Sequence, residues 1–138
     1  DYKDVHVEVT VKDNSSDPTT AFGIVCDQQV TDSAFYYVGM TPAGEYAIVK
    51  AAVAQKDVFL SNNGEWAKSD SITTQSPSYR VGADCGNGSV TLYVDGKQID
   101  SVVDTTYTKG KVALFAWSNK DKNSSDVTFD DFVITPLK

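Results

Sequence analysis

The sequence predicts an all-β fold, with one domain over residues 1–138 folded as an antiparallel sandwich of two sheets. Apolar and polar residues alternate with a period of two in several segments, which is typical of strands that bury one face. Turn signals rich in Gly, Asn, Asp and Pro separate these segments at short intervals. Helical periodicity is almost absent. Many short strands with polar connections predict a sandwich or a barrel.

The expected strands follow one another along the whole chain. The first alternates four valines with polar residues between positions 5 and 11. Asp95 and Gly96 form a strong signal for a two-residue hairpin turn, and the polar stretch 118–126 is expected to be a loop. In chain order, the expected strands cover residues 5–11, 22–26, 35–40, 45–50, 53–60, 79–85, 90–94, 97–103, 111–117 and 127–134.

The charge and hydropathy of the chain exclude two kinds of partner. With 12 basic and 19 acidic residues, the formal net charge is −7. An acidic surface repels phosphate, so no nucleic-acid partner is expected. No apolar run reaches the roughly 20 residues of a membrane-spanning helix, so no membrane span is expected either. The abrupt start at Asp1 is expected for a processed mature protein or an excised domain.

The two cysteines, Cys26 and Cys85, are predicted to form a disulfide. Strand alternation places Cys26 on the same face as Ile24, and Cys85 on the same face as Ala83, so both thiols point inward. A disulfide indicates an oxidising compartment, and therefore an extracellular location. Two buried free thiols remain the alternative.

A series of short motifs occurs in a set order along the chain, in the segments 22–26, 36–37, 44–50, 79–85, 92–96, 110–116 and 129–132. The order of these motifs resembles that of the concanavalin A-like, laminin-G-like jelly-roll domains of extracellular bacterial proteins, near the 3-keto-disaccharide hydrolase-type domains. The resemblance covers about Val5 to Ile134. It implies a two-sheet jelly roll at the cell surface or outside the cell.

The sequence lacks the pair of catalytic carboxyl groups that some enzymes of this fold family use. Related laminarinase-like glucanases use a Glu-x-Asp-x-x-Glu strand, because retaining hydrolysis needs two carboxyl groups about 5 Å apart. None of Glu8, Glu45 and Glu65 lies in such a motif, and the only histidine, His6, has no nucleophile motif beside it. The leading hypothesis is a non-catalytic binding or adhesion module for carbohydrate or a cell-surface partner. A glycan-processing enzyme and a structural subunit of a surface layer or filament are the alternatives.

The hairpin around residues 41–44 supplies the predicted ligand-binding residues. If Met40 lies opposite Glu45, then Tyr37, Tyr46 and Lys50 share the open face of the sheet. Aromatic rings with polar tips suit sugar rings, which present apolar C–H faces and hydroxyl groups. Alternatively, these rings only cover the outer sheet through cross-strand pairs. Trp66, in a polar loop, is expected either to extend this platform or to cap the core.

The last strand carries the predicted metal site. Adjacent residues of a strand point to opposite faces, so one of Asp130 and Asp131 is expected to face the interior and to need a partner. Arg80, the only arginine, is one expected partner because its planar fork binds carboxylates. The other expected partner is a structural calcium ion, held by Asp130, Asp131 and Glu8. Asp4 is expected nearby, on the first strand. No other cofactor is expected.

Overall fold

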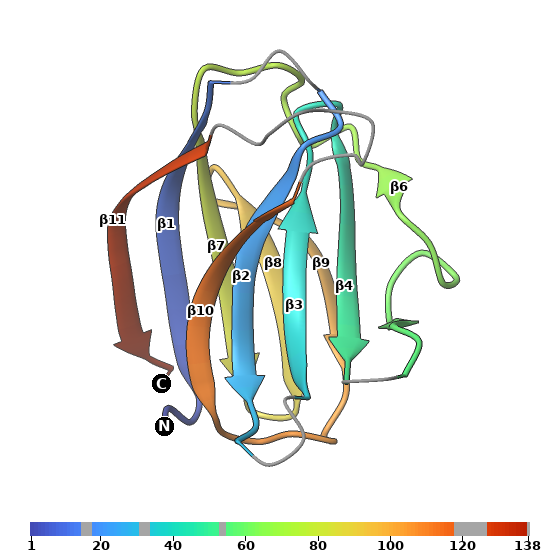
Figure 1. The fold of residues 1–138 in the computed structure, drawn as a ribbon, viewed down its shortest axis with the longest axis vertical. Coiled ribbons are helices and arrows are strands. Elements are labelled where there is room, and N and C mark those ends of the chain that lie inside the picture. The colour runs from blue at the N-terminus through green and yellow to red at the C-terminus, as the bar shows by residue number, and fades with distance from the viewer. Residues whose placement is uncertain (15–17, 31–33, 53–54, 118–126, 138) are drawn as a thin grey trace.

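The computed structural model describes residues 1–14, 18–30, 34–52, 55–117 and 127–137. These residues form two antiparallel sheets packed face to face, as predicted (Figure 1). One sheet has the order β11-β1-β7-β8-β9, and the other has the order β10-β2-β3-β4-β5, with β6 paired to β4. The strands are β1 (Val5–Asp13), β2 (Ala21–Gln28), β3 (Phe35–Met40), β4 (Glu45–Ala51), β5 (Val58–Phe59), β6 (Ala67–Lys68), β7 (Tyr79–Gly86), β8 (Ser89–Val94), β9 (Lys97–Val103), β10 (Lys111–Trp117) and β11 (Val127–Pro136).

Most predicted strands agree with the structure within two residues at each end. The expected strand over 53–60 is the exception, because its described part pairs only at Val58–Phe59. The short strand β6 was not predicted, since two residues carry no periodicity. The expected loop 118–126 lies outside the described residues. No helix among the described residues is long and apolar enough to cross a membrane.

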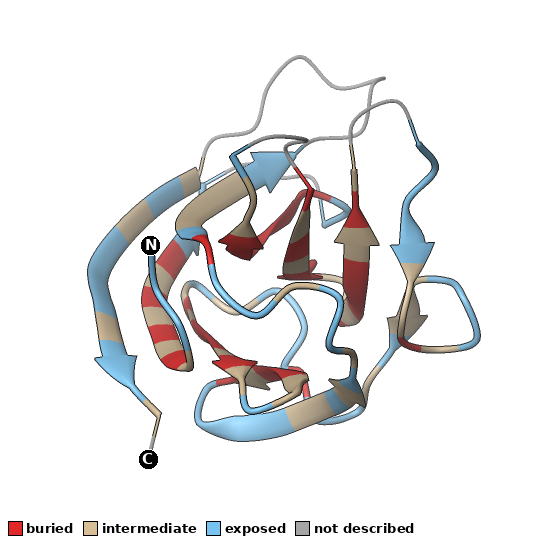
Figure 2. Cartoon of the chain, turned by 90° about the horizontal axis from the view of Figure 1, so that it is seen from below, coloured by how far each residue is buried: buried red, intermediate tan, exposed pale blue. Residues whose placement is uncertain are grey.

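The core lies between the two sheets, where alternate residues of each strand meet. The four valines of β1 are at most 6% exposed, and Phe22, Ile24 and Cys26 face them from β2. Figure 2 shows the buried residues concentrated in the central strands, whereas β11 is largely exposed. Each large apolar side chain that is fully buried contributes about 1.5–3 kcal/mol, so this alternation stabilises the sandwich.

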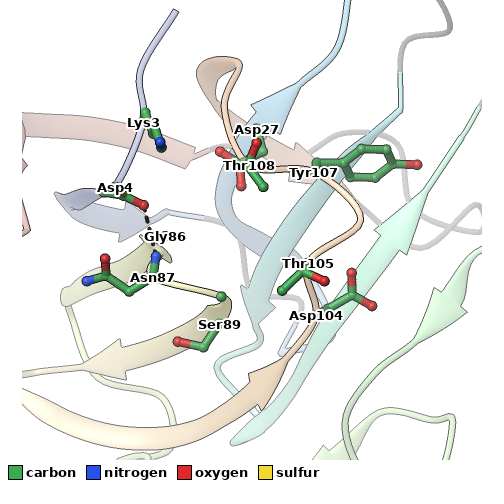
Figure 3. A pocket seen from close by; sticks show the side chains of 11 residues that line it. Lys3, Asp4, Asp27, Gly86, Asn87, Ser89, Asp104, Thr105, Tyr107 and Thr108 are labelled. Carbon is green, nitrogen blue, oxygen red and sulfur yellow. Dashed lines mark hydrogen bonds between the residues drawn. The ribbon is translucent and has the colours of Figure 1, made fainter.

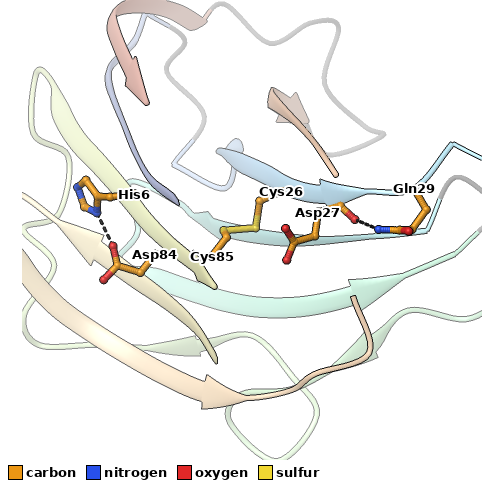
Figure 4. The surroundings of a disulfide bond; sticks show 6 residues. All are labelled: His6, Cys26, Asp27, Gln29, Asp84 and Cys85. Atoms are coloured by element: carbon orange, nitrogen blue, oxygen red, sulfur yellow. Dashed lines mark hydrogen bonds and ion pairs between the residues drawn. A yellow bond between two sulfur atoms is a disulfide. The ribbon is translucent and has the colours of Figure 1, made fainter. Parts of the chain in front are cut away.

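A disulfide between Cys26 and Cys85 joins the sheets through β2 and β7 (Figure 4). This confirms the predicted pairing, and the described residues contain no free cysteine. Both cysteines are at most 1% exposed. The bridge spans a sequence separation of 59 residues, which corresponds to about 4 kcal/mol in the chain-entropy model.

The β3–β4 hairpin has a different register from the predicted one. Met40 lies opposite Tyr46, not opposite Glu45. The amide of Thr41 donates to the carbonyl of Glu45, and Gly44 takes a positive φ of 92° to close the turn. The turn therefore holds one residue more than expected. Because side chains alternate along a strand, this single residue moves every side chain of β4 to the opposite face relative to β3.

Candidate functional site

The predicted platform of Tyr37, Tyr46 and Lys50 on one open face is wrong. The observed register places Tyr46 and Lys50 on the inner face of β4, opposite Met40 and Tyr36, while Tyr37 lies on the outer face of β3. Tyr46 is only 7% exposed and belongs to the core. The two faces of the hairpin therefore have separate roles.

The inner face carries a group that we call the tyrosine seam: Tyr36, Tyr46, Lys50, Asp100 and Asp104. It joins β3 and β4 to β9 and to the chain that follows β9. The hydroxyl of Tyr46 lies 2.9 Å from Asp100 Oδ2 and 2.9 Å from Asn62 Oδ1. The hydroxyl of Tyr36 donates to Asp104, and Lys50 Nζ lies 3.2 Å from the other oxygen of that carboxylate. The tyrosine seam closes one edge of the sandwich.

The charges of the tyrosine seam depend on one another. Burial, reinforced by the carboxylate of Asp104, raises the pKa of Tyr36 to about 12. Burial opposes ionisation of Asp104, but hydrogen bonds from Tyr36, Thr106 and Lys50 outweigh it and hold the pKa of this carboxyl well below its ordinary value. At neutral pH the tyrosine is a donor and the aspartate an acceptor. Because these groups satisfy one another, the seam is structural.

The outer face of the same sheet contains a hollow that we call the aromatic groove. It is a cavity of about 280 Å³, formed where β10, β2 and β3 lie side by side. In the register of these strands, Phe115 lies opposite Gly23 and Val25 opposite Tyr37, so alternate residues of each strand reach the same side. The groove is lined by Val25, Phe35, Tyr37, Asp57, Phe115 and Trp117.

Aromatic rings form the walls of the groove, and a glycine makes room for them. The rings of Tyr37 and Phe115 meet edge to face, with centroids 5.3 Å apart. A Cβ atom on Gly39 would lie 2.8 Å from Phe115 Cζ and 3.2 Å from Trp66 Cη2, so both rings rest against this glycine. Trp66 thus packs beside the groove without lining it. Trp117 is 61% exposed and offers an open ring face.

One carboxylate lies among these rings. The hydroxyl of Tyr37 donates to Asp57 Oδ2 at 3.3 Å. Burial, and secondarily the charge of Asp57, raise the pKa of Tyr37, so this hydroxyl keeps its proton at neutral pH. Asp57 is itself exposed and has acceptor capacity left for a ligand. The groove therefore combines a largely apolar surface with a few polar groups, as small-ligand sites do.

The predicted partners of Arg80 and of the two aspartates are wrong. Asp130 and Asp131 are both exposed, because the pairing of β1 with β11 shifts between Glu8 and Thr10, and Asp131 has a φ of +54°. This irregularity breaks the alternation on which the prediction depended. Arg80 instead donates to Glu8 Oε1 and to the carbonyl oxygen of Asp131, both at 2.9 Å.

The predicted calcium ligands do not fit that ion either. Glu8 is engaged by Arg80 on one oxygen and by His6 Nε2 on the other. Among the described residues, no three His, Cys, Asp or Glu side chains are grouped so that they could hold a metal ion. The set Glu8, Asp130 and Asp131 therefore supports no metal site on the last strand.

His6 belongs to a polar network on the outer face of the five-stranded sheet. Its Nδ1 lies 2.5 Å from Asp84 Oδ1, and its Nε2 lies 2.9 Å from Glu8 Oε2. Tyr93 donates to the second oxygen of Asp84 at 2.8 Å. Burial lowers the pKa of His6, but the two carboxylates outweigh it and raise this pKa above 6.5. These groups pair with one another, which indicates a structural role for His6.

Comparison with known proteins shows the fold but no sequence family. No family model matches the chain, and no curated protein matches it. The carbohydrate-binding module CBM66 from Bacillus subtilis is similar with a TM-score of 0.73 and 11% identity, over 96% of this chain and 75% of that one. Sheep galectin-11, in complex with glycerol, has a TM-score of 0.66 and 8% identity, over 97% of this chain and 91% of that one.

An enzyme of the same architecture is also similar. The Bacillus licheniformis beta-glucanase has a TM-score of 0.57 and 12% identity, over 99% of this chain and 68% of that one. These structures confirm the predicted fold class, a two-sheet concanavalin A-like jelly roll. At such low identity they show the fold alone. The finer resemblance to 3-keto-disaccharide hydrolase-type domains stays a prediction.

The sequence contained a signal for the groove that the prediction did not use. Phe115 and Trp117 alternate along β10, in the same way as Phe35 and Tyr37 along β3. Two strands that each carry a pair of alternating aromatics mark an aromatic face wherever the strands lie close together. Asp57 had no such signal, because its place beside Tyr37 depends on the path of the chain after β4.

Proposed function

We propose that the domain is a non-catalytic glycan-binding module and that the aromatic groove is its binding site. The single observation that carries this proposal is the exposed ring of Trp117 at a cavity walled by Phe35, Tyr37 and Phe115. A sugar ring that stacks on such a surface removes apolar area from water on both partners. The carbohydrate-binding proteins that share the fold support the same proposal.

The polar groups of the groove fit hydroxyl groups. Asp57 accepts hydrogen bonds, and Tyr37 holds one of its oxygens at 3.3 Å. A sugar hydroxyl that donates to Asp57 fixes the orientation of the ring stacked on Trp117. Shallow sites of this kind give Kd values of roughly micromolar to millimolar.

The composition of the groove favours binding over hydrolysis. Among the described lining residues, Asp57 is the one carboxylate, whereas most glycoside hydrolases need two that flank the scissile bond. We also infer an extracellular or cell-surface location, which the disulfide supports. A cell-surface protein as the partner is the alternative, and a glycan screen separates the two.

The test compares two aromatic residues from opposite faces of one sheet. Trp117→Ala removes the exposed ring of the groove and is expected to weaken glycan binding at least tenfold while the Tm stays close to that of the wild type. Tyr46→Phe changes the tyrosine seam and is expected to leave binding unchanged. A glycan array identifies the ligand, and isothermal titration calorimetry measures both variants against it.

Quenching of tryptophan fluorescence gives an independent measurement. The chain has two tryptophans, and Trp117→Phe keeps an aromatic ring but removes the reporter at the groove. Binding that persists in this variant without the wild-type fluorescence change assigns the ligand to the groove. If the wild type binds no glycan across a broad panel, or if Trp117→Ala binds as the wild type does, the proposal is wrong.

A further inference from the structure

A second pocket lies between the ends of several strands. Its walls are polar, unlike those of the aromatic groove. Its volume is about 280 Å³. It is enclosed by the N-terminal segment before β1, the end of β2, the β7–β8 turn and the chain after β9 (Figure 3). Nothing in the proposed glycan site uses this pocket. Its lining includes the carboxylates of Asp4, Asp27 and Asp104 and the hydroxyl groups of Ser89, Thr105, Tyr107 and Thr108.

Asp27 is the unusual residue of this pocket. It is only 3% exposed, yet no hydrogen bond or ion pair of its carboxylate appears among the described residues. Gln29 Nε2 binds its backbone carbonyl instead, at 2.8 Å (Figure 4). Asp27 also has a φ of +53°, where the pairing of β10 with β2 shifts. A buried carboxylate without a partner is costly, so the fold keeps an unfavourable group here.

Asp4 brings a second negative charge to the same pocket. Its Oδ1 accepts a hydrogen bond from the amide of Asn87 at 2.9 Å, which leaves the other oxygen available (Figure 3). Gly86 lets Asp4 approach closely, since a Cβ at this glycine would lie 2.3 Å from Asp4 Cα. Burial, and next the charge of Asp4, raise the pKa of Asp27 to about 6. The two carboxylates therefore repel each other across the pocket.

None of the ion pairs among the described residues involves Asp27 or Asp4. Lys3 lines the pocket, but its residue is exposed, and it takes part in none of the ion pairs of the described residues. Asp104, the third carboxylate of the lining, already pairs with Lys50. A bound cation would compensate Asp27 and Asp4 together.

We propose that this pocket binds a calcium ion through the carboxylates of Asp27 and Asp4. Calcium is a hard cation that takes carboxylate, hydroxyl and backbone carbonyl oxygens in flexible geometry. The pocket offers these oxygens and neither histidine nor a free thiol, which zinc and copper prefer. Two carboxylates are fewer than in high-affinity sites, so a Kd of about 10⁻⁴–10⁻³ M is expected, as in extracellular calcium modules.

The test uses calcium and terbium with the whole chain. Adding 10 mM calcium chloride (about ten times the weakest expected Kd) to EDTA-treated protein should raise the Tm by several degrees, and calorimetry should show one site. Terbium is a luminescent substitute for calcium. Tyr107 lines the pocket and can transfer excitation energy to it, so binding should produce luminescence that calcium displaces.

Three variants locate the ion, each removing one negative charge with little change of shape. Asp27→Asn and Asp4→Asn should each weaken calcium binding at least tenfold and abolish the rise in Tm. Asp130→Asn is the matched control on the last strand and should bind as the wild type does. Glycan binding by the aromatic groove should be unchanged in all three, so failure of this proposal is distinguishable from failure of the proposed function.

Three results would overturn the proposal. The first is a wild-type protein that shows no heat, no terbium luminescence and no change in Tm with calcium. The second is an Asp27→Asn variant, folded by circular dichroism, that binds calcium with wild-type affinity. The third is loss of binding in Asp130→Asn alone, which would place the ion on the last strand instead.

Discussion

The two faces of the β3–β4 hairpin carry the same kinds of residue and use them in opposite ways. On the inner face, Tyr36 and Tyr46 are at most 7% exposed, and their hydroxyl groups donate to carboxylates in β9 and just after it. On the outer face, Phe35 and Tyr37 line an open cavity together with residues of β10. An aromatic ring with a polar tip closes an edge on one side and walls a groove on the other.

This difference depends on what lies opposite each face. The inner tyrosines meet Asp100 and Asp104, which accept hydrogen bonds from their hydroxyl groups. The outer rings meet small residues, since Gly23 and Gly39 lie opposite each other in neighbouring strands. Residue type alone therefore does not identify a binding face. The partners supplied by the rest of the chain do.

The largest effect is expected from Gly23→Ala, which tests whether the outer face of the sheet needs a residue without a side chain at this position. A Cβ on Gly23 would lie 1.9 Å from the carbonyl oxygen of Val38. Because this obstacle is backbone, the β2–β3 pairing itself must shift, at a cost of about 3 kcal/mol in unfolding free energy. Urea denaturation measures the loss of unfolding free energy. A variant as stable as the wild type would show that position 23 does not require glycine.

A smaller effect is expected from Tyr36→Phe, on the inner face. The change removes the hydroxyl group that donates to Asp104. The same hydroxyl oxygen accepts a hydrogen bond from the amide of Tyr107 at 3.2 Å, so this bond is lost as well. Loss of a buried hydrogen bond to a charged group costs about 2 kcal/mol. Glycan binding should be unaffected, because the outer face is unchanged. Chemical denaturation and titration of the same ligand check the two halves of this prediction.

The same variant has a predictable pH dependence. Asp104 has a lowered pKa in the folded state, so its ionised form stabilises the fold. That stability is fully present above the ordinary pKa of 3.8 and is lost as pH falls below it. The difference in unfolding free energy between the wild type and Tyr36→Phe should therefore shrink from pH 7 to pH 2. A difference that stays constant over this range would show that Asp104 is not the partner that matters.

The smallest effect on stability is expected from Gly39→Ala. Its Cβ would crowd the far ends of Phe115 and Trp66, at 2.8 and 3.2 Å, whereas the carbonyl oxygen of Phe22 lies at an ordinary contact distance of 3.5 Å. These rings can move, so the cost should be about 1 kcal/mol or less. Because the rings border the groove, glycan binding should nevertheless weaken several-fold. Paired measurements of Tm and Kd check this, and unchanged binding would separate Gly39 from the site.

The strands themselves could be predicted from the sequence. Alternation in β1 and the aspartate-glycine turn between β8 and β9 are local signals, and they placed strand after strand near its observed bounds. The inward direction of Cys26 and Cys85 followed from the same alternation. The candidate site could be predicted only in part, because the prediction assigned Tyr46 and Lys50 to the open face and did not include Phe115 and Trp117.

The sequence by itself determined which residues form strands and which of them are apolar on one side, because both depend on neighbours one or two positions away. Only the tertiary structure decided which sides face outward and which strands lie together. One additional residue in the turn after Met40 reversed the faces of β4, and the pairing of β10 with β2 brought Phe115 and Trp117 beside Tyr37. Asp27 is isolated for a similar reason: its burial depends on segments far from it in the chain, which enclose the carboxylate without contributing a partner among the described residues.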